Sequence, residues 1–102
     1  MEVAVHTPAL DYLLGAYFHQ DFFDEHGGVW ETVDAFIAND PHRAEQVAVE
    51  IDQLLAESTE QELVKHVEAA GSSYRADWDG DTYRGWLTHI ADRVRRATAG
   101  PA

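Results

Sequence analysis

The clearest structural signal in the chain is AEQVAVEIDQLL, residues 44–55. Its apolar side chains recur three and four positions apart, which is the spacing of one face of an α-helix. Acidic and amide side chains fill most positions between them, so we expect a helix that buries one face and exposes the other. The expected buried face consists of Ala44, Val47, Ala48, Ile51, Leu54 and Leu55, and the expected solvent face of Glu45, Gln46, Glu50, Asp52 and Gln53.

Four other segments show the same period, within residues 8–18, 29–39, 60–70 and 82–96. No run alternates apolar and polar side chains for long enough to predict a sheet. A chain of 102 residues has room for one domain and for no second core. We therefore expect an all-α fold, a single compact bundle of about five helices over residues 1–102, with residues 97–102 as a frayed tail.

Local signals mark where several of these helices begin and end. A capping side chain accepts a hydrogen bond from an N–H group that the first turn leaves without a partner. A glycine in the left-handed conformation often follows the last turn. The expected N-caps are Asp40, Thr59 with Glu62 in a capping box, and Asp81 or Thr82; the expected C-terminal glycine is Gly71, and residues 72–81 are expected to form a loop with a turn at Asp79 and Gly80.

Gly15 and Gly85 each fall inside a predicted helix. Glycine at such a position costs about 0.5 to 1 kcal/mol relative to alanine, because its backbone loses more freedom on folding. We expect the compensation at both positions to be the close approach of a neighbouring helix or of a large ring.

The chain carries a surplus of negative charge: seven Lys and Arg residues against nineteen Asp and Glu residues give a formal charge of −12. A field of this sign repels nucleic acid and anionic lipid and attracts basic surfaces. Residues 1–42 hold eight of the carboxylates and no Lys or Arg. We therefore expect one side of the molecule to be acidic, its partner to have a basic surface, and no direct binding to nucleic acid or to membrane.

The sequence also bears on the compartment. The chain has no Cys, no signal-peptide pattern at its N-terminus, and no apolar run of the roughly 20 residues that span a bilayer. A chain without Cys forms no disulfide and fits a reducing compartment. We expect a cytoplasmic protein that is a monomer when free.

The densest cluster of chemically capable side chains lies between residues 17 and 30. Histidine and carboxylate side chains together bind zinc or non-haem iron. The segment lacks the histidine pair of a metalloprotease helix, so we favour aromatic side chains that close one end of the core, with no metal or other cofactor. The alternative is a small metal-binding protein or metal-dependent enzyme that uses His19, Asp21, Asp24 and His26.

Other catalytic signals are weak. The segment DWDGD, residues 77–81, resembles the start of a calcium loop, but its glycine stands at position 4 of that loop instead of position 6. His89 stands at the edge of an apolar stripe, where we expect a half-buried, hydrogen-bonded side chain and no general base. With no phosphate loop, nucleophile elbow or paired-carboxylate motif, we expect no catalytic residue and no enzyme. A self-associating helical adaptor is a third interpretation.

Four segments carry a family resemblance: LLGAYFHQD (13–21), VDAF (33–36), EIDQLL (50–55) and DGDTYRGWL (79–87). In this order they resemble the immunity-protein family of bacterial contact-dependent growth inhibition systems. The most specific parts are YFHQD and the Tyr-x-x-Trp-Leu of the last segment. The resemblance covers about residues 8–96, and Phe22 departs from it, since the family usually has tryptophan there.

The resemblance implies a cytoplasmic protein that binds the C-terminal toxin domain of a large exported protein made beside it and neutralises that toxin. Such toxin domains are frequently nucleases. A nuclease cleft is cationic because it holds phosphates, and an acidic helical surface is suited to occupy it, with complementary charge raising the encounter rate. The resemblance supplies no catalytic residues.

We expect the partner-binding surface to combine carboxylates with aromatic anchors. Contact residues must discriminate between toxins, so the resemblance does not identify them. His19 is expected to make a polar contact that fixes the first helix against the last. The residues expected in the core are Tyr17, Phe18, Trp86 and Leu87. The candidate partner-binding residues are Asp21, Phe22, Phe23, Asp24, Glu25, Glu31, Asp34 and Trp78.

Overall fold

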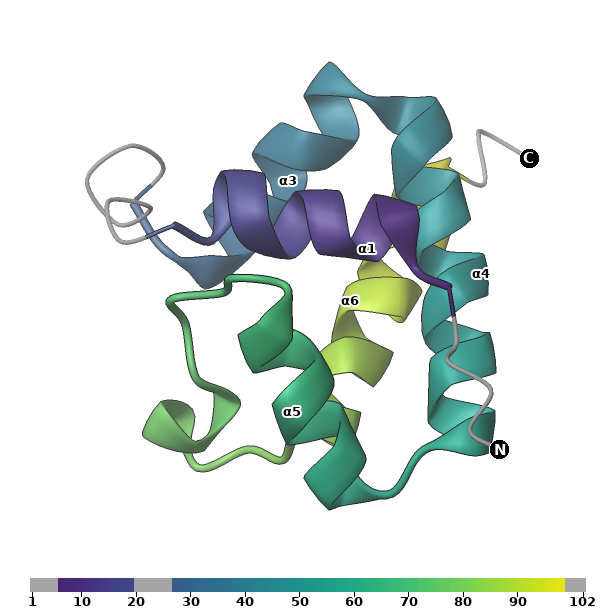
Figure 1. Cartoon of the computed structure of the whole chain (residues 1–102). Coiled ribbons are helices and arrows are strands. Elements are labelled where there is room, and N and C mark those ends of the chain that lie inside the picture. Colours follow the sequence, from purple (N-terminus) through teal and green to yellow (C-terminus); the bar gives the residue numbers. More distant parts are fainter. Residues whose placement is uncertain (1–5, 20–26, 99–102) are drawn as a thin grey trace.

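Every regular element of the described residues, 6–19 and 27–98, is a helix in the computed structural model (Figure 1). At positions 78 and 79 the backbone alone is described. The absence of strands from these residues confirms the predicted all-α bundle. The elements are α1 (Pro8–Tyr12), which the π-helical turn η1 (Leu13–Tyr17) continues, α3 (Val29–Asn39), α4 (Pro41–Glu57), α5 (Glu60–Ala69), the short 3-10 helix η2 (Ala76–Asp79) and α6 (Tyr83–Thr98).

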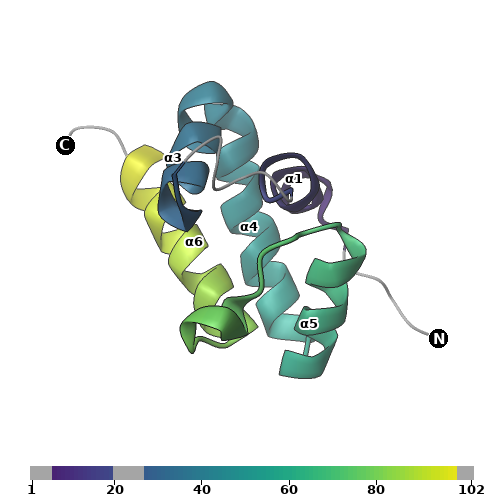
Figure 2. The ribbon, with the colours of Figure 1, turned by 90° about the vertical axis from the view of Figure 1, so that its left-hand side faces the viewer.

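Helix α4 is the centre of the bundle. It contacts α1, α3 and α6, and α6 in turn contacts α5. Figure 2 shows α4 between α1 and α5 on one side and α3 and α6 on the other. The predicted apolar face of α4 therefore meets three neighbouring helices. Ala44, Val47, Ala48, Ile51 and Leu54 are buried there, and Leu55 is half-buried.

Aromatic side chains form a cluster within the core. The rings of Phe18 and Trp86 lie edge to face with their centroids 5.4 Å apart, and the Tyr74 ring lies 4.9 Å from that of Trp86. Phe18, Trp86 and Leu87 are fully buried as predicted, whereas Tyr17 is only half-buried. Tyr74 belongs to the segment predicted as a loop, so this loop contributes to the core.

One side chain of α4 points the opposite way from the prediction. The expectation that Glu50 faces solvent is wrong, because only 2% of the residue is exposed. Its carboxyl oxygens accept hydrogen bonds from the backbone N–H groups of Ala9 (3.3 Å) and Leu10 (2.9 Å) at the start of α1. The first N–H groups of a helix have no partner within that helix. A side chain from a distant part of the sequence here satisfies two of them.

A second long-range contact joins the ends of α4, α5 and α6. Glu60, the first residue of α5, accepts hydrogen bonds from the backbone N–H groups of Tyr83 (2.7 Å) and Arg84 (3.1 Å). The Arg84 guanidinium donates to the carbonyl oxygens of Leu55 (2.9 Å) and Ser58 (2.5 Å) at the end of α4. Two side chains of opposite charge therefore satisfy the start of one helix and the end of another.

Short-range caps lie where the sequence predicts them. Each predicted N-cap side chain accepts a hydrogen bond from a backbone N–H of the first turn. Helix α6 continues to Thr98, so positions 97 and 98 are helical and not part of a frayed tail. Residues 99–102 lie outside the described part of the chain. The confirmed signals are the N-caps Asp40 and Thr82, the capping box of Thr59 with Glu62, and the left-handed glycines Gly71 (φ 93°) and Gly80 (φ 75°).

The close approach predicted at Gly15 is confirmed. A Cβ atom at this position would lie 2.8 Å from the backbone oxygen of Ala70, just after α5. The surrounding backbone forms a single π-helical turn, which a hydrogen bond of 3.3 Å from the Phe18 N–H to the Leu13 oxygen closes. Such turns are rare in helices, and the sequence does not predict this one.

The corresponding prediction is wrong at Gly85. A Cβ atom there would meet the side-chain oxygens of Asp81 and Thr82, which directly precede the same helix. The glycine leaves room for the residues that cap α6, and no neighbouring helix or ring is among these nearest atoms.

We expect Glu50→Ala to lower the free energy of unfolding by about 3 kcal/mol, because it leaves two buried N–H groups without an acceptor. The matched control is Glu45→Ala on the exposed face of the same helix, which should change that free energy by less than about 0.5 kcal/mol. Urea unfolding followed by circular dichroism measures both values. Equal losses in the two variants would contradict the capping role of Glu50.

The same substitution should act differently at the two helical glycines. Gly15→Ala places a methyl group against the backbone of Ala70, and we expect it to lower the free energy of unfolding by about 1 to 3 kcal/mol. Gly85→Ala requires the Asp81 side chain to rotate and the Thr82 hydroxyl to shift slightly. The higher helix propensity of alanine offsets part of that cost, by about 1 kcal/mol at most. Scanning calorimetry compares the two. A Gly15→Ala protein as stable as the wild type would refute the close approach.

Candidate functional site

Only part of the predicted partner-binding surface lies in the described residues. Glu31 and Asp34 lie one turn apart on the exposed side of α3. The surface that can be described is therefore the outer face of α3 and the part of α6 beside it. The remaining candidates lie outside the described residues or, for Trp78, are described without a side chain: they are Asp21, Phe22, Phe23, Asp24, Glu25 and Trp78.

Asp34 is already paired within the protein. Its oxygens accept hydrogen bonds of 2.7 and 2.8 Å from the Arg93 guanidinium, which makes a bidentate ion pair between α3 and α6. These hydrogen bonds, helped by the attraction between the charges, hold the pKa of the Asp34 carboxyl below its ordinary value of 3.8. The Asp34 and Arg93 side chains are 54% and 42% exposed, so water screens the pair and its contribution to stability is small.

A second cation near the C-terminal end of α6 is also paired within the protein, through a single hydrogen bond to a carboxylate. Arg95 donates to the Asp52 carboxyl of α4 and to the Ala48 carbonyl oxygen. Two cations of α6 are thus bonded to carboxylates of α3 and α4. The separation of charge in the folded molecule is therefore smaller than the order of charges along the sequence suggests.

A groove between α3 and α6 lies beside the Asp34–Arg93 pair. It has a volume of about 240 Å³ and is lined by Trp30, His89, Arg93 and Arg96. The Arg93 guanidinium lies over the Trp30 ring, 5.4 Å from its centroid, and the His89 ring lies 6.3 Å from the same ring. The prediction that His89 is half-buried is wrong, because its side chain is 62% exposed and lines this groove.

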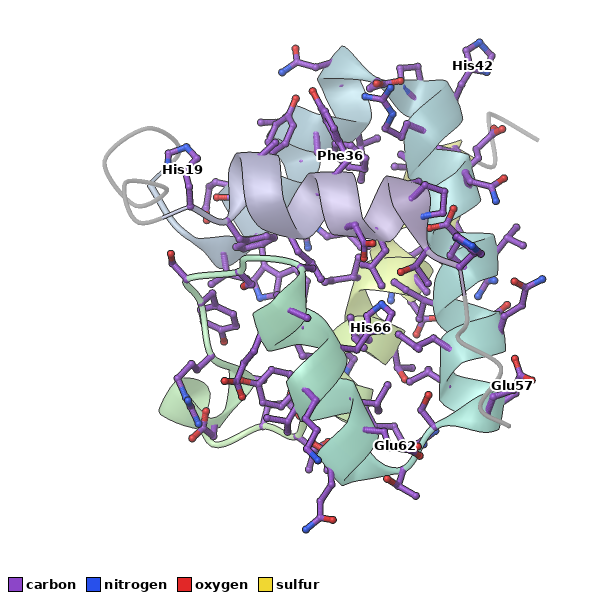
Figure 3. The ribbon with its side chains drawn as sticks, viewed as in Figure 1. His19, Phe36, His42, Glu57, Glu62 and His66 are labelled. Atoms are coloured by element: carbon purple, nitrogen blue, oxygen red, sulfur yellow. The ribbon has the colours of Figure 1, made fainter. Side chains whose placement is uncertain are left out.

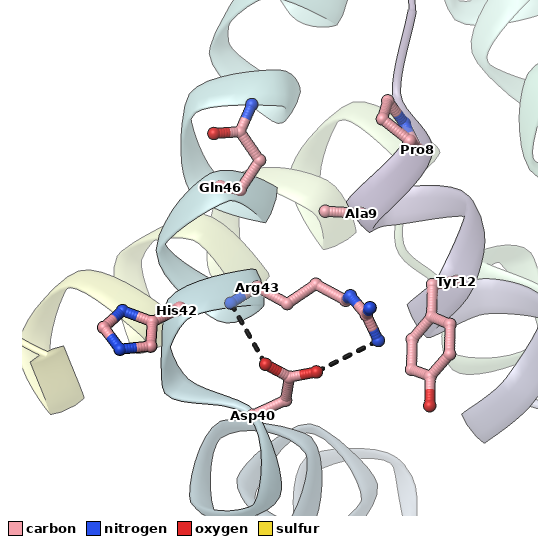
Figure 4. Close-up of a pocket in the computed structure, with 7 residues that line it drawn as sticks. All are labelled: Pro8, Ala9, Tyr12, Asp40, His42, Arg43 and Gln46. Carbon is pink, nitrogen blue, oxygen red and sulfur yellow. Dashed lines mark hydrogen bonds and ion pairs between the residues drawn. The ribbon is translucent and has the colours of Figure 1, made fainter.

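A larger hollow of about 490 Å³ lies where the start of α1 meets the start of α4 (Figure 4). Arg43 forms an ion pair of 3.0 Å with Asp40 and lies over the Tyr12 ring, 4.1 Å from its centroid. Tyr12 and Val49 are the exposed large apolar side chains of the described residues. Tyrosine and arginine dominate the binding energy of many interfaces. The hollow is therefore a second candidate surface, and the sequence does not predict it.

The histidines shown in Figure 3, His19, His42 and His66, lie on separate parts of the molecule. Within residues 6–19 and 27–98, no group of three or more His, Cys, Asp or Glu side chains is arranged to hold a metal ion. The contact expected between His19 and α6 stays a prediction. The other members of the alternative metal site, Asp21, Asp24 and His26, lie outside the described residues.

A polar cluster that the sequence does not predict joins α1 to α5. The buried Thr7 hydroxyl donates to the Asp11 carboxyl at 2.8 Å and lies 2.7 Å from Nε2 of His66. Because the hydroxyl has one proton, Nε2 of His66 is the donor in the second contact. Asp11 lies 3.5 Å from the same Nε2, so it does not orient the ring from Nδ1 as in a catalytic triad. The cluster holds α1 against α5.

The fold defines the chain as a small all-α protein, and the part of it that the structure describes contains no assembled metal centre. The family model of the CdiI immunity protein matches residues 6–94, so the chain belongs to the CdiI immunity protein family. CdiI proteins are the immunity proteins of contact-dependent growth inhibition systems. The match confirms the family that the four sequence segments predict.

Comparison with the curated proteins and with the solved structures found no match to this chain. Family membership therefore rests on the match over residues 6–94. None of the helices in the described ranges has the length and apolar character needed to cross a membrane.

The Asp34–Arg93 pair should stabilise the protein only while Asp34 is ionised. A carboxyl whose pKa is lower in the folded chain contributes fully above its unfolded pKa, near 3.8, and loses the contribution as pH falls through the folded pKa. We expect Asp34→Asn to lower the free energy of unfolding by less than about 1 kcal/mol at neutral pH. This difference from the wild type should shrink as the pH falls below about 4.

Urea unfolding at about pH 7, 5 and 3 measures this difference. The control is Asp92→Asn, an exposed residue of α6 for which no ion pair with a described residue is found. A loss in Asp34→Asn that stays constant down to the lowest pH would show that the ion pair is not its cause.

Proposed function

We propose that this chain binds the C-terminal toxin domain of a contact-dependent growth inhibition protein made beside it and neutralises that toxin. The observation that carries the proposal is family membership over residues 6–94. An immunity protein acts by occupying its toxin, so the proposal needs a stoichiometric complex and no catalytic residue.

The charge of the chain supports a toxin with a basic surface. A formal charge of −12 steers a cationic partner toward the protein and raises the rate of encounter. A nuclease is the toxin class that fits best, because its substrate site must be cationic to hold phosphates. The complex would form in the cytoplasm, where a monomeric immunity protein meets the toxin before nucleic acid does.

The acidic contact surface that we propose lies at the N-terminal end of α3. Glu31 is exposed there, shortly after the segment that contains Asp21, Asp24 and Glu25. Asp34 supplies less free charge, because Arg93 is already bonded to it. The aromatic anchors that we propose are Phe22, Phe23 and Trp78.

The test is to produce this chain together with the toxin domain that the neighbouring gene encodes. We expect a one-to-one complex in size-exclusion chromatography and survival of cells that express both proteins, with loss of viability when the toxin domain is expressed alone. A toxin domain that neither binds this chain nor is neutralised by it would refute the proposal.

Glu31→Lys should weaken binding to the toxin domain by about tenfold or more, because it places a cation against a basic partner. The matched control is Glu68→Lys on the exposed side of α5, which changes the net charge equally and should weaken binding by less than about threefold. Isothermal titration calorimetry at low and moderate salt measures both, and the loss should be smaller at the higher salt. Equal losses in the two variants would place the contact surface elsewhere.

A further inference from the structure

The groove between α3 and α6 is lined by two arginines on a protein whose formal charge is −12. Three of the side chains that line it are His89, Arg93 and Arg96 of α6, and Trp30 of α3 forms the remaining wall. Positions separated by four and then three residues share one face of a helix, so α6 presents the His89 imidazole and the two guanidinium groups as a row. The acidic surface proposed above does not use this row.

The three groups differ in the interactions that they already make within the protein. Arg93 is held by Asp34 and lies over the Trp30 ring. His89 lies 3.9 Å from the Asp81 carboxyl through Nδ1, which leaves Nε2 without a described partner. Arg96 is exposed and makes no hydrogen bond or ion pair with the other described residues. No described residue therefore competes with another molecule for its guanidinium.

The chemistry of the groove selects an anion with a short apolar stem. A guanidinium donates two parallel hydrogen bonds to a carboxylate or a phosphate, and a tryptophan ring packs against an apolar stem. The volume of about 240 Å³ is below the roughly 300 to 1,000 Å³ of small-molecule sites, so it suits one side chain better than a nucleotide. The charge of the whole chain repels a phosphate backbone. A carboxylate on a folded protein is the occupant that meets all these conditions.

We propose that this groove receives an aspartate or glutamate side chain of the toxin domain, bound by Arg96 and His89 beside the Trp30 ring. The inference rests on the proposed function for the identity of the partner. Glu31 directly follows Trp30 in α3, so the interface has an acidic part and a basic part next to each other. Two patches of opposite sign fix the orientation of the partner and repel a toxin with a different arrangement of charge.

Arg96→Glu tests the groove, and Lys65→Glu is its matched control. Both residues are exposed, and both substitutions change the net charge equally. Lys65 lies on α5, which Figure 2 shows across α4 from α3. We expect Arg96→Glu to weaken binding to the toxin domain by about tenfold or more and Lys65→Glu by less than about threefold, in calorimetry. Arg96→Glu places a carboxylate in the last turn of α6, so its melting temperature should fall modestly, and both variants should be fully folded at the temperature of the titration.

An exchange of charges then identifies the group that enters the groove. Each exposed Asp and Glu of the toxin domain is changed to Arg, one at a time. Each of these toxin variants is then titrated with the wild-type form of this chain and with its Arg96→Glu variant. One of these reversals should weaken binding to the wild type and restore most of the binding to Arg96→Glu, as coupled partners do in a double-mutant cycle.

The outcomes separate this inference from the function on which it rests. A wild-type chain that does not bind the toxin domain refutes the proposed function and the inference together. Tight binding by the wild type, with equal losses in Arg96→Glu and Lys65→Glu or with no restoring reversal, overturns the inference alone. A fluorescein-labelled single-stranded oligonucleotide that binds the wild type but not Arg96→Glu would also overturn it, because the groove would then be a phosphate site.

Discussion

Backbone N–H groups at the start of a helix need acceptors from outside that helix, and two glutamates of other helices provide them in this bundle. Glu50 of α4 accepts hydrogen bonds from the first turn of α1, and Glu60 of α5 accepts them from the first turn of α6. Arg84 completes the second contact by donating to the end of α4. Because these contacts fix where α1 and α6 begin, they also fix the aromatic core around Trp86 and the face that α6 shows beside α3.

The sequence predicts the helices well, because the signals for them act over a few residues. Apolar spacing and caps such as Asp40 and Thr59 depend on neighbours within about one turn. The burial of Glu50 escapes prediction because the N–H groups that it meets lie about 40 residues away, and because glutamate on a helix is usually exposed. The burial of Tyr74 is not predicted for a similar reason: the residue lies in an aperiodic segment, and residues distant in the sequence bury it.

The candidate site was harder to predict than the fold. Charge along the sequence singles out Glu31 and Asp34, but it does not reveal that Asp34 meets Arg93, which stands 59 residues further along the chain. The groove requires α3 and α6 to lie side by side. The spacing of His89, Arg93 and Arg96 is visible in the sequence, yet these side chains line a groove only because Trp30 of α3 closes it.

The segments that carry the family resemblance serve mainly to build the bundle. Phe18, Glu50 and Trp86 are buried, and Arg84 bonds to the end of α4. The outward-facing charges of α3 and α6 have little part in that interior work. Under the proposed function, single substitutions can therefore change the charges that a toxin would meet while the buried side chains that hold the bundle together stay the same.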